Sequence, residues 1–137
     1  MPYKVLVADD DEGQRQSHAF ALEEAGKIAG DTVEVIYAKN SVEARQMLMS
    51  QEFSLAIIDN DFRDANIQGH LPGIALMQIA RKGGPNVRTP MVFCSADPFD
   101  GLAAMVEKYN AVLLPKSKYD IEKVASMFAE QMKKGKK

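Results

Sequence analysis

The sequence lacks several features that would assign it to a special class of protein. It has one cysteine, Cys94, no tryptophan and two histidines among 137 residues. A single cysteine excludes an internal disulfide framework and suits a reducing compartment. The absence of a His/Cys cluster argues against a zinc site. No apolar run approaches the length of a membrane span. Tyr3 opens a strand-like run close to the N-terminus, so we expect no signal peptide and a cytoplasmic protein.

The charge balance is also close to neutral. Lys and Arg number 17 and Asp and Glu number 19, which gives a formal net charge of −2. This balance argues against general nucleic-acid binding, although a local basic patch remains compatible with it. The length suits one hydrophobic core and is short for two ordinary domains, so we expect residues 1–137 to form a single domain.

Two kinds of apolar pattern alternate along the chain. Short β-rich runs predict strands at Tyr3–Ala8, Val33–Ala38, Phe53–Ile58, Pro90–Cys94 and Ala111–Leu114. Apolar residues at helical spacing predict helices at Gln14–Ala25, from Asn40 or Ser41 through Leu48, from Pro72 to about Gly83, at Pro98–Tyr109 and at Tyr119–Met132. Five strands alternating with five helices predict a parallel sheet with helices on both faces, joined by right-handed crossovers.

Some finer expectations concern the first helix and its surroundings. Gly26 is expected to cap the C-terminus of this helix, and Phe20 to lie on its inward stripe. His18 is expected on a helix surface and Cys94 in the core. The basic tail from Lys133 to Lys137 is expected to be frayed.

The most informative stretch runs from Leu55 to Asp61. Four apolar residues lead straight into Asp59. A short continuous apolar run is typical of a strand covered on both faces. A carboxylate at its end lies at the edge where open parallel sheets bind ligands. An aspartate after a strand is also a common helix cap or turn residue. From this stretch alone both interpretations remain open.

Asp61 follows two residues after Asp59 at the end of the same strand, and three other predicted strands also end in polar side chains, namely Asp9 and Asp10, Ser95, and Lys116. Carboxylates that converge on a small volume repel one another and stay ionised only around a cation. An all-oxygen set suits Mg²⁺. An ammonium and a hydroxyl opposite the acids suit the oxygens of a phosphoryl group. Together these groups are the ones needed to form an aspartyl-phosphate.

These segments, in this order and near these spacings, resemble the receiver domain of bacterial two-component response regulators. The matching pieces are Val5-Leu6-Val7-Ala8-Asp9-Asp10, Ile57-Ile58-Asp59, Ser95-Ala96 and Lys116, and Arg15 stands where the family often has arginine. The resemblance covers essentially the whole chain. It implies a flavodoxin-like (CheY-like), doubly wound, five-stranded parallel sheet with five helices.

The resemblance also implies roles for single residues. Asp9 and Asp10 resemble the acid pair that holds Mg²⁺, and Asp59 resembles the phosphoacceptor that adjoins the metal. The backbone carbonyl of Asp61 resembles a third protein ligand of the metal. Ser95 and Lys116 resemble the residues that bind the phosphoryl oxygens.

The function implied is phosphoryl transfer to Asp59 from a phosphohistidine. The donor would be a sensor histidine kinase or a histidine phosphotransfer protein. The signal would pass by contact to an unknown downstream protein, without direct contact to nucleic acid or membrane. The chain itself is not expected to be an enzyme.

The chain departs from the family at several positions. Phe62-Arg63 stands where the family usually has Met-Pro, and Ser117 replaces the proline that follows the lysine, so we expect a trans peptide there. Gly73 follows Asp59 by 14 residues instead of eight, which adds six residues to the loop. Leu113 replaces the aromatic switch residue. We therefore hypothesise that the Asn60–Leu71 loop carries most of the response to phosphorylation.

Two other functions remain open. The departures favour a pseudo-receiver, a binding module that keeps the fold without phosphorylation. Asp59-Asn60-Asp61 after an apolar strand also resembles the Asp-x-Asp of haloacid-dehalogenase-type phosphatases. In that family the motif follows the first strand and a longer chain comes after it, whereas here it follows the third predicted strand.

Overall fold

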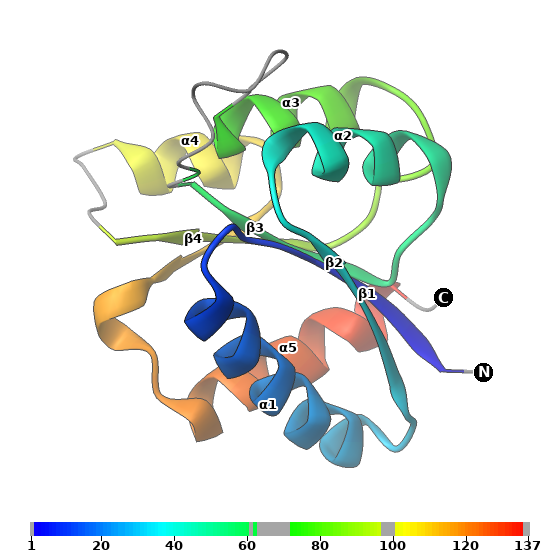
Figure 1. The fold of residues 1–137 in the computed structure, drawn as a ribbon, viewed down its shortest axis with the longest axis vertical. Helices are drawn as coiled ribbons and strands as arrows, with labels where there is room; N and C mark the ends of the chain where they lie inside the picture. The colour runs from blue at the N-terminus through cyan, green and yellow to red at the C-terminus, as the bar shows by residue number, and fades with distance from the viewer. Residues whose placement is uncertain (1, 61, 63–71, 97–100, 136–137) are drawn as a thin grey trace.

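The sheet is parallel and has helices on both faces, as predicted (Figure 1). The computed structural model describes residues 2–60, 62, 72–96 and 101–135. Within them the strands are β1 (Tyr3–Ala8), β2 (Val33–Ala38), β3 (Leu55–Asp59), β4 (Met91–Ser95) and β5 (Val112–Pro115). Their order across the sheet is β2-β1-β3-β4-β5, and every neighbouring pair is parallel.

Helices cover the sheet in two layers. One face carries α1 (Glu12–Ala29) and α5 (Ile121–Gly135). The other face carries α2 (Ser41–Ser50), α3 (Gly73–Lys82) and α4 (Leu102–Lys108). A short 3₁₀ turn, η1 (Lys116–Lys118), follows β5 and leads toward α5. Figure 1 shows the two helical layers above and below the sheet.

The central strands explain the continuous apolar runs of the sequence. In β3, Leu55 and Ile57 pack toward the α1 and α5 side, and Ala56 and Ile58 pack toward the other helices. All five residues of β3 are buried, and so are all five residues of β4. Side chains alternate between faces along a strand, so a strand covered on both sides must be apolar at successive positions.

The first helix differs from its prediction. It continues to Ala29, and Gly30 caps it with a left-handed φ of 84°. Gly26 lies inside the helix, where a Cβ atom would lie 2.7 Å from the carbonyl oxygen of Asp31. The predicted cap was therefore wrong, because glycine is used at this position for a close backbone approach. Phe20 was predicted to face inward but has 56% of its surface exposed.

Other boundaries shift by a few residues. Asp59, Ser95 and Pro115 end their strands rather than following them. Asn40 caps α2, because its Oδ1 accepts a hydrogen bond from the Glu43 amide at 2.9 Å. The last helix extends through Lys133 and Lys134, which were predicted to belong to a frayed tail. The predicted helix Pro98–Tyr109 is found as α4, and residues 97–100 lie outside the described part.

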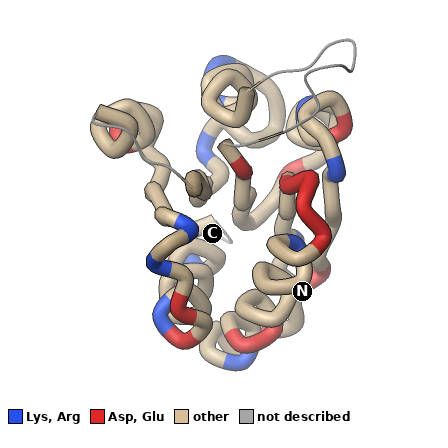
Figure 2. Tube along the Cα trace, turned by 60° about the vertical axis from the view of Figure 1, so that its left-hand side comes forward, with Lys and Arg blue, Asp and Glu red and all other residues tan. Residues whose placement is uncertain are grey.

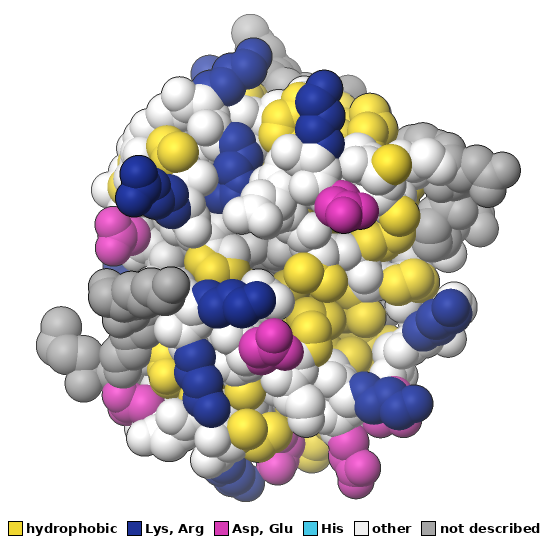
Figure 3. Space-filling model, turned by 180° about the vertical axis from the view of Figure 1, so that it is seen from behind, with side chains coloured by type: hydrophobic (Ala, Val, Ile, Leu, Met, Phe, Trp, Pro, Cys, Tyr) yellow, Lys and Arg dark blue, Asp and Glu magenta, His cyan; other side chains and the backbone are white. Residues whose placement is uncertain are grey.

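The β5 edge of the sheet is only partly covered. Val112 and Leu113 are half-buried there, between α4 and α5. The view from behind in Figure 3 shows apolar side chains gathered near the middle of this face, with Lys and Arg side chains among and around them. None of the helices in the described residues combines the length and apolar character needed to cross a membrane.

Candidate functional site

The sheet topology brings the predicted site residues to one edge. Ala8 pairs with Ile58, Asp59 pairs with Cys94, and Ser95 pairs with Pro115, so these strand ends lie next to one another. In Figure 2 the acidic segment after β1 faces the acidic end of β3. This edge is the carboxyl end of a parallel sheet, where ligands bind in folds of this kind.

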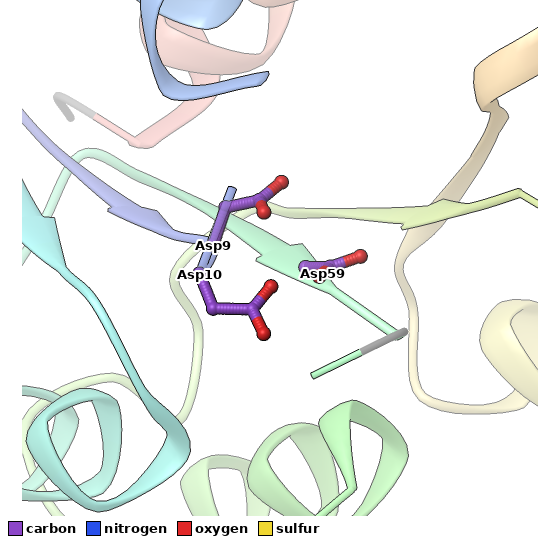
Figure 4. A group of neighbouring side chains, drawn as sticks. All are labelled: Asp9, Asp10 and Asp59. Carbon is purple, nitrogen blue, oxygen red and sulfur yellow. The ribbon is translucent and has the colours of Figure 1, made fainter. Parts of the chain in front are cut away.

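Three carboxylates converge at this edge. Asp9, Asp10 and Asp59 each offer one oxygen, and these three oxygens lie within 4.8 Å of one another. Figure 4 shows Asp9 and Asp10 just after β1 and Asp59 at the end of β3, on adjacent strands. Asp9 and Asp59 are buried, and Asp10 is half-buried. Asp61, the fourth predicted metal residue, lies outside the described residues.

The surroundings of the Asp9 carboxyl disfavour its negative charge. Burial, followed by the nearby Asp59 charge, raises the pKa of Asp9 to about 7. A hydrogen bond from the Asp11 amide to Oδ1, at 2.9 Å, and the charge of Lys116 oppose this rise. Among the described residues the buried Oδ2 atom has no hydrogen-bond partner. A buried, unsatisfied oxygen beside two further carboxylates fits a hard divalent cation such as Mg²⁺, which would offset the repulsion.

Lys116 and Ser95 complete the edge. The ammonium of Lys116 donates to Asp59 Oδ1 at 2.7 Å, and the two side chains are 17% and 1% exposed. The hydroxyl of Ser95 is buried and has no hydrogen-bond partner among the described residues. The described residues contain no cis peptide bond, so the Lys116–Ser117 bond is trans as predicted. A cation bonded to Asp59 and a buried hydroxyl at the end of the neighbouring strand suit the oxygens of an added phosphoryl group.

The start of α3 is pressed against Asp59. A Cβ atom on Gly73 would collide with the carbonyl oxygen of Asp59 and would lie 2.9 Å from the Cα atom of Asn60. Gly73 is buried and begins the helix directly after Pro72. Gly73 therefore opens α3, as the resemblance to receiver domains implies, although the loop between Asp59 and this helix has six extra residues. Phe62 packs against the core beside α3, while Arg63 and most of the Asn60–Leu71 loop, with its hypothesised response, lie outside the described residues.

Substituting Gly73 tests this close approach. Gly73→Ala is expected to destabilise the fold by about 1–3 kcal/mol, because the new methyl group must displace backbone rather than a flexible side chain. Urea denaturation measures the effect. Gly83→Ala is the matched control, since nothing lies within 4 Å of a Cβ there and its φ is extended. Equal stability of the Gly73→Ala variant and wild type would show that the α3 start can move away from Asp59 freely.

His18 contradicts its prediction. Instead of lying on the helix surface, it is 1% exposed. Its Nδ1 atom lies 2.8 Å from the Tyr119 hydroxyl, and its Nε2 atom lies 3.9 Å from Asp9 Oδ2. Burial, and secondarily the charge of Lys116, lowers the pKa of His18 to about 4, so the ring is neutral near pH 7. The sequence showed a polar residue on a helix, but nothing local indicated that this side of α1 packs against α5.

Three other residues named in the sequence analysis have defined positions around this edge of the sheet. Arg15 donates from Nη1 to the backbone carbonyl of Asp9 at 3.0 Å, which ties the first turn of α1 to the end of β1. Leu113 is half-buried and packs against the cluster on the α2, α3 and α4 side. Cys94 is buried in the core on the opposite side, as predicted.

Comparison by sequence alone finds little. No protein-family model matches the chain, and no curated protein matches it.

Comparison by structure finds receiver domains over nearly the full length of the chain. The chain is similar to the Francisella response regulator 1452 receiver domain, with 26% identity and a TM-score of 0.77, covering 98% of this chain and 99% of that one. It is similar to a CheY-like response regulator receiver domain protein from Methanospirillum hungatei, with 17% identity and a TM-score of 0.74, covering 98% and 97%.

A third similar structure is the receiver domain of the sensor histidine kinase PA1611 from Pseudomonas aeruginosa, described with a magnesium ion coordinated in its active-site cleft. It has 13% identity and a TM-score of 0.75, and the match covers 97% of this chain and 99% of that one. The predicted doubly wound fold is confirmed. The resemblance to receiver domains is confirmed as well.

Proposed function

We propose that this chain, which has the fold of response-regulator receiver domains, accepts a phosphoryl group on Asp59 in an Mg²⁺-dependent reaction. The observation that carries the proposal is the joint position of Asp59, its 2.7 Å ion pair with Lys116, and the two further acids within 4.8 Å. The phosphoryl donor is a phosphohistidine on a sensor histidine kinase or a histidine phosphotransfer protein. Receiver domains of histidine kinases are among the similar structures, which supports this class of partner.

The carboxylates of Asp9, Asp10 and Asp59 would hold the Mg²⁺ ion, with the Asp61 carbonyl as the further ligand implied by the resemblance. When bound, the ion supplies positive charge that offsets the three carboxylates and the phosphoryl oxygens. It would also keep Asp9 ionised, although burial raises the pKa of Asp9 in its absence.

The remaining chemistry belongs to the side chains of this chain. An Asp59 carboxylate oxygen attacks the phosphorus atom of the donor. A P–O bond forms while the P–N bond to the donor imidazole breaks, and the imidazole nitrogen takes the electron pair. Lys116 then pairs with phosphoryl oxygens instead of with Asp59 alone. The Ser95 hydroxyl donates a hydrogen bond to another of these oxygens, and so gains a partner that it lacks among the described residues.

The signal then passes to a downstream protein by surface contact. We propose no direct binding of nucleic acid or membrane and no catalytic turnover by this chain. The single cysteine suits a reducing cytoplasmic setting.

The test is intact-protein mass spectrometry after incubation with Mg²⁺ and a small phosphodonor, acetyl phosphate. The expected result is a gain of one phosphoryl group that requires both reagents. A parallel sample with a chelator in place of Mg²⁺ is the control. No gain of mass in the presence of both reagents would contradict the proposal.

A pseudo-receiver is the second candidate, because Leu113 and Ser117 depart from the family at positions near the site. Failure of the labelling experiment would favour it. A haloacid-dehalogenase-type phosphatase is a weaker candidate, because Asp59 ends the third strand and not the first. Sustained hydrolysis of a small phosphate ester by the pure protein, lost in Asp59→Asn, would support that candidate instead.

A further inference from the structure

A short polar chain crosses the otherwise apolar layer between the sheet and the α1–α5 pair. It runs from Tyr119, two residues before α5, through His18 on α1 to Asp9 at the end of β1. The Tyr119 hydroxyl lies 2.8 Å from His18 Nδ1, and Asp9 Oδ2 lies 3.9 Å from His18 Nε2. Tyr119 is half-buried, whereas His18 and Asp9 are each 1% exposed.

The direction of this chain follows from the chemistry of its members. A neutral imidazole has one N–H and one nitrogen lone pair. When the Tyr119 hydroxyl donates to Nδ1, the hydrogen of His18 is on Nε2, which lies 3.9 Å from Asp9 Oδ2 and 4.0 Å from Cys94 Sγ. The other tautomer would turn a lone pair toward an ionised carboxylate. When a bound cation keeps Asp9 ionised, the favoured tautomer is therefore the one in which Tyr119 donates to His18 and the Nε2 hydrogen points toward Asp9.

We propose that His18 is a positioning residue for Asp9, and that the Tyr119–His18–Asp9 chain couples the acidic site to the start of α5. The inference rests on the proposed function, because Asp9 acts here as a carboxylate that binds Mg²⁺.

The distance between His18 Nε2 and Asp9 Oδ2 allows two arrangements, one with this hydrogen bond open and one with it formed. The 3.9 Å gap is about 1 Å longer than a hydrogen bond between these atom types. Asp9 Oδ2 is buried and has no hydrogen-bond partner among the described residues. When the carboxylate turns to bind a cation, closing this gap satisfies Oδ2 and fixes the orientation of the carboxylate. Hydrogen-bonded partners of metal ligands typically change metal affinity by about 10–100-fold when removed.

The other end of the chain connects to α5 by packing. The ring of His18 lies 5.3 Å from the ring of Tyr119 and 6.1 Å from that of Phe128, measured between centroids. Asp120, the residue after Tyr119, accepts hydrogen bonds from the first amides of α5. A shift of His18 toward Asp9 therefore reaches the first turn of α5 through two neighbours. Leu113 packs on the opposite face of the sheet, so this connection does not pass through the position that has lost its aromatic ring.

The test uses variants that distinguish the contact made by His18 Nδ1 from the contact made by His18 Nε2. His18→Gln keeps an N–H donor near the place of Nε2, and His18→Asn keeps a polar group near the place of Nδ1. Tyr119→Phe removes one oxygen, and Tyr37→Phe on β2 is the matched control for loss of a tyrosine hydroxyl. Amide NMR spectra during Mg²⁺ titration give two readouts, the Kd for Mg²⁺ and the shifts of the Ile121–Ala125 amides.

In the wild type, Mg²⁺ is expected to shift these α5 amides together with those near Asp59. His18→Asn should raise the Kd about ten-fold. His18→Gln should keep the Kd within about three-fold of wild type but lose the α5 shifts. Tyr119→Phe should also lose the α5 shifts, whereas Tyr37→Phe should change neither readout.

Three results would overturn the inference. In the first, the folded His18 variants and Tyr119→Phe bind Mg²⁺ and shift α5 as wild type does, which would make the chain a purely structural contact. In the second, wild type binds Mg²⁺ and is phosphorylated without α5 shifts, and only this inference fails. In the third, wild type neither binds Mg²⁺ nor gains a phosphoryl group, and the proposed function fails with it. Tyr119→Phe changes the structure least and keeps the test decisive if the His18 variants do not fold.

Discussion

Replacing Asp59 with asparagine is expected to abolish phosphoryl labelling completely. The amide of asparagine has the shape of the carboxylate but lacks its negative charge and is a poor nucleophile toward phosphorus. Asp59 is buried at the end of the central strand and bonded to Lys116, so no other carboxylate in the described residues has the same position. Intact-protein mass spectrometry with Mg²⁺ and acetyl phosphate measures the result, and far-ultraviolet circular dichroism checks that the variant is folded.

Asp31→Asn is the matched control, because Asp31 lies in the turn between α1 and β2 at the opposite edge of the sheet. This variant should gain one phosphoryl group as wild type does. Lys116→Met should still be labelled at Asp59, but on the order of 100-fold more slowly, since a preorganised cation at the developing charge is lost. Equal labelling of wild type and Asp59→Asn would assign the acceptor to another residue.

Asp9 is expected to make the metal-free protein less stable as the pH rises. In the folded state, burial and the Asp59 charge raise the pKa of Asp9 from 3.8 to about 7. The folded protein therefore holds a proton that the unfolded chain has released. This contribution to stability is fully present below about pH 3.8 and is lost as the pH rises through about 7. Each pKa unit corresponds to about 1.4 kcal/mol, so the loss is on the order of a few kcal/mol.

His18 acts in the opposite direction over part of the same range. Its folded-state pKa is lowered from 6.5 to about 4, so its contribution is present above pH 6.5 and is lost as the pH falls toward 4. The charged groups Asp10, Asp59 and Lys116 also face Asp9. A comparison with Asp9→Asn isolates the contribution of the Asp9 charge. The side-chain oxygen of asparagine can still accept the hydrogen bond that the Asp11 amide donates to Asp9 Oδ1.

The measurement is urea denaturation of wild type and Asp9→Asn with a chelator, from about pH 5 to about pH 8. Asp9→Asn should become progressively the more stable of the two as the pH rises. Added Mg²⁺ should reverse this order, because a ligand at 100 times its Kd stabilises the folded state by about 2.7 kcal/mol. Asp31→Asn should follow wild type throughout. Parallel stability curves for wild type and Asp9→Asn would contradict the assigned pKa, and no effect of Mg²⁺ on wild type would argue against a metal site.

Much of the acidic edge could be predicted from local sequence. Leu55–Ile58 is apolar at every position, which is typical of a strand covered on both faces and so favours a parallel sheet. In a parallel sheet all strands end at the same edge, so residues at the ends of different strands must gather there. Asp9, Asp59, Ser95 and Lys116 could therefore be assigned to one edge from the alternation of strands and helices alone.

The faces and ends of α1 could not be predicted in the same way. Nothing in the residues around His18 or Phe20 specifies which side of the helix meets α5, since that helix begins about 100 residues later in the chain. Packing against α5 buries His18 and leaves Phe20 exposed. Gly26 and Gly30 are both plausible caps by type, and the close passage of the Asp31 carbonyl assigns the first to packing and the second to the cap.

The sequence by itself thus determined the order of strands and helices, the parallel sheet and the acidic edge, because these follow from periodicity and from which residues end each strand. Only the tertiary structure decided the ion pair between Lys116 and Asp59, the raised pKa of Asp9 and the His18–Tyr119 contact. The physical reason is that these properties depend on distances between residues far apart in the chain, and on how completely packing removes water from between them.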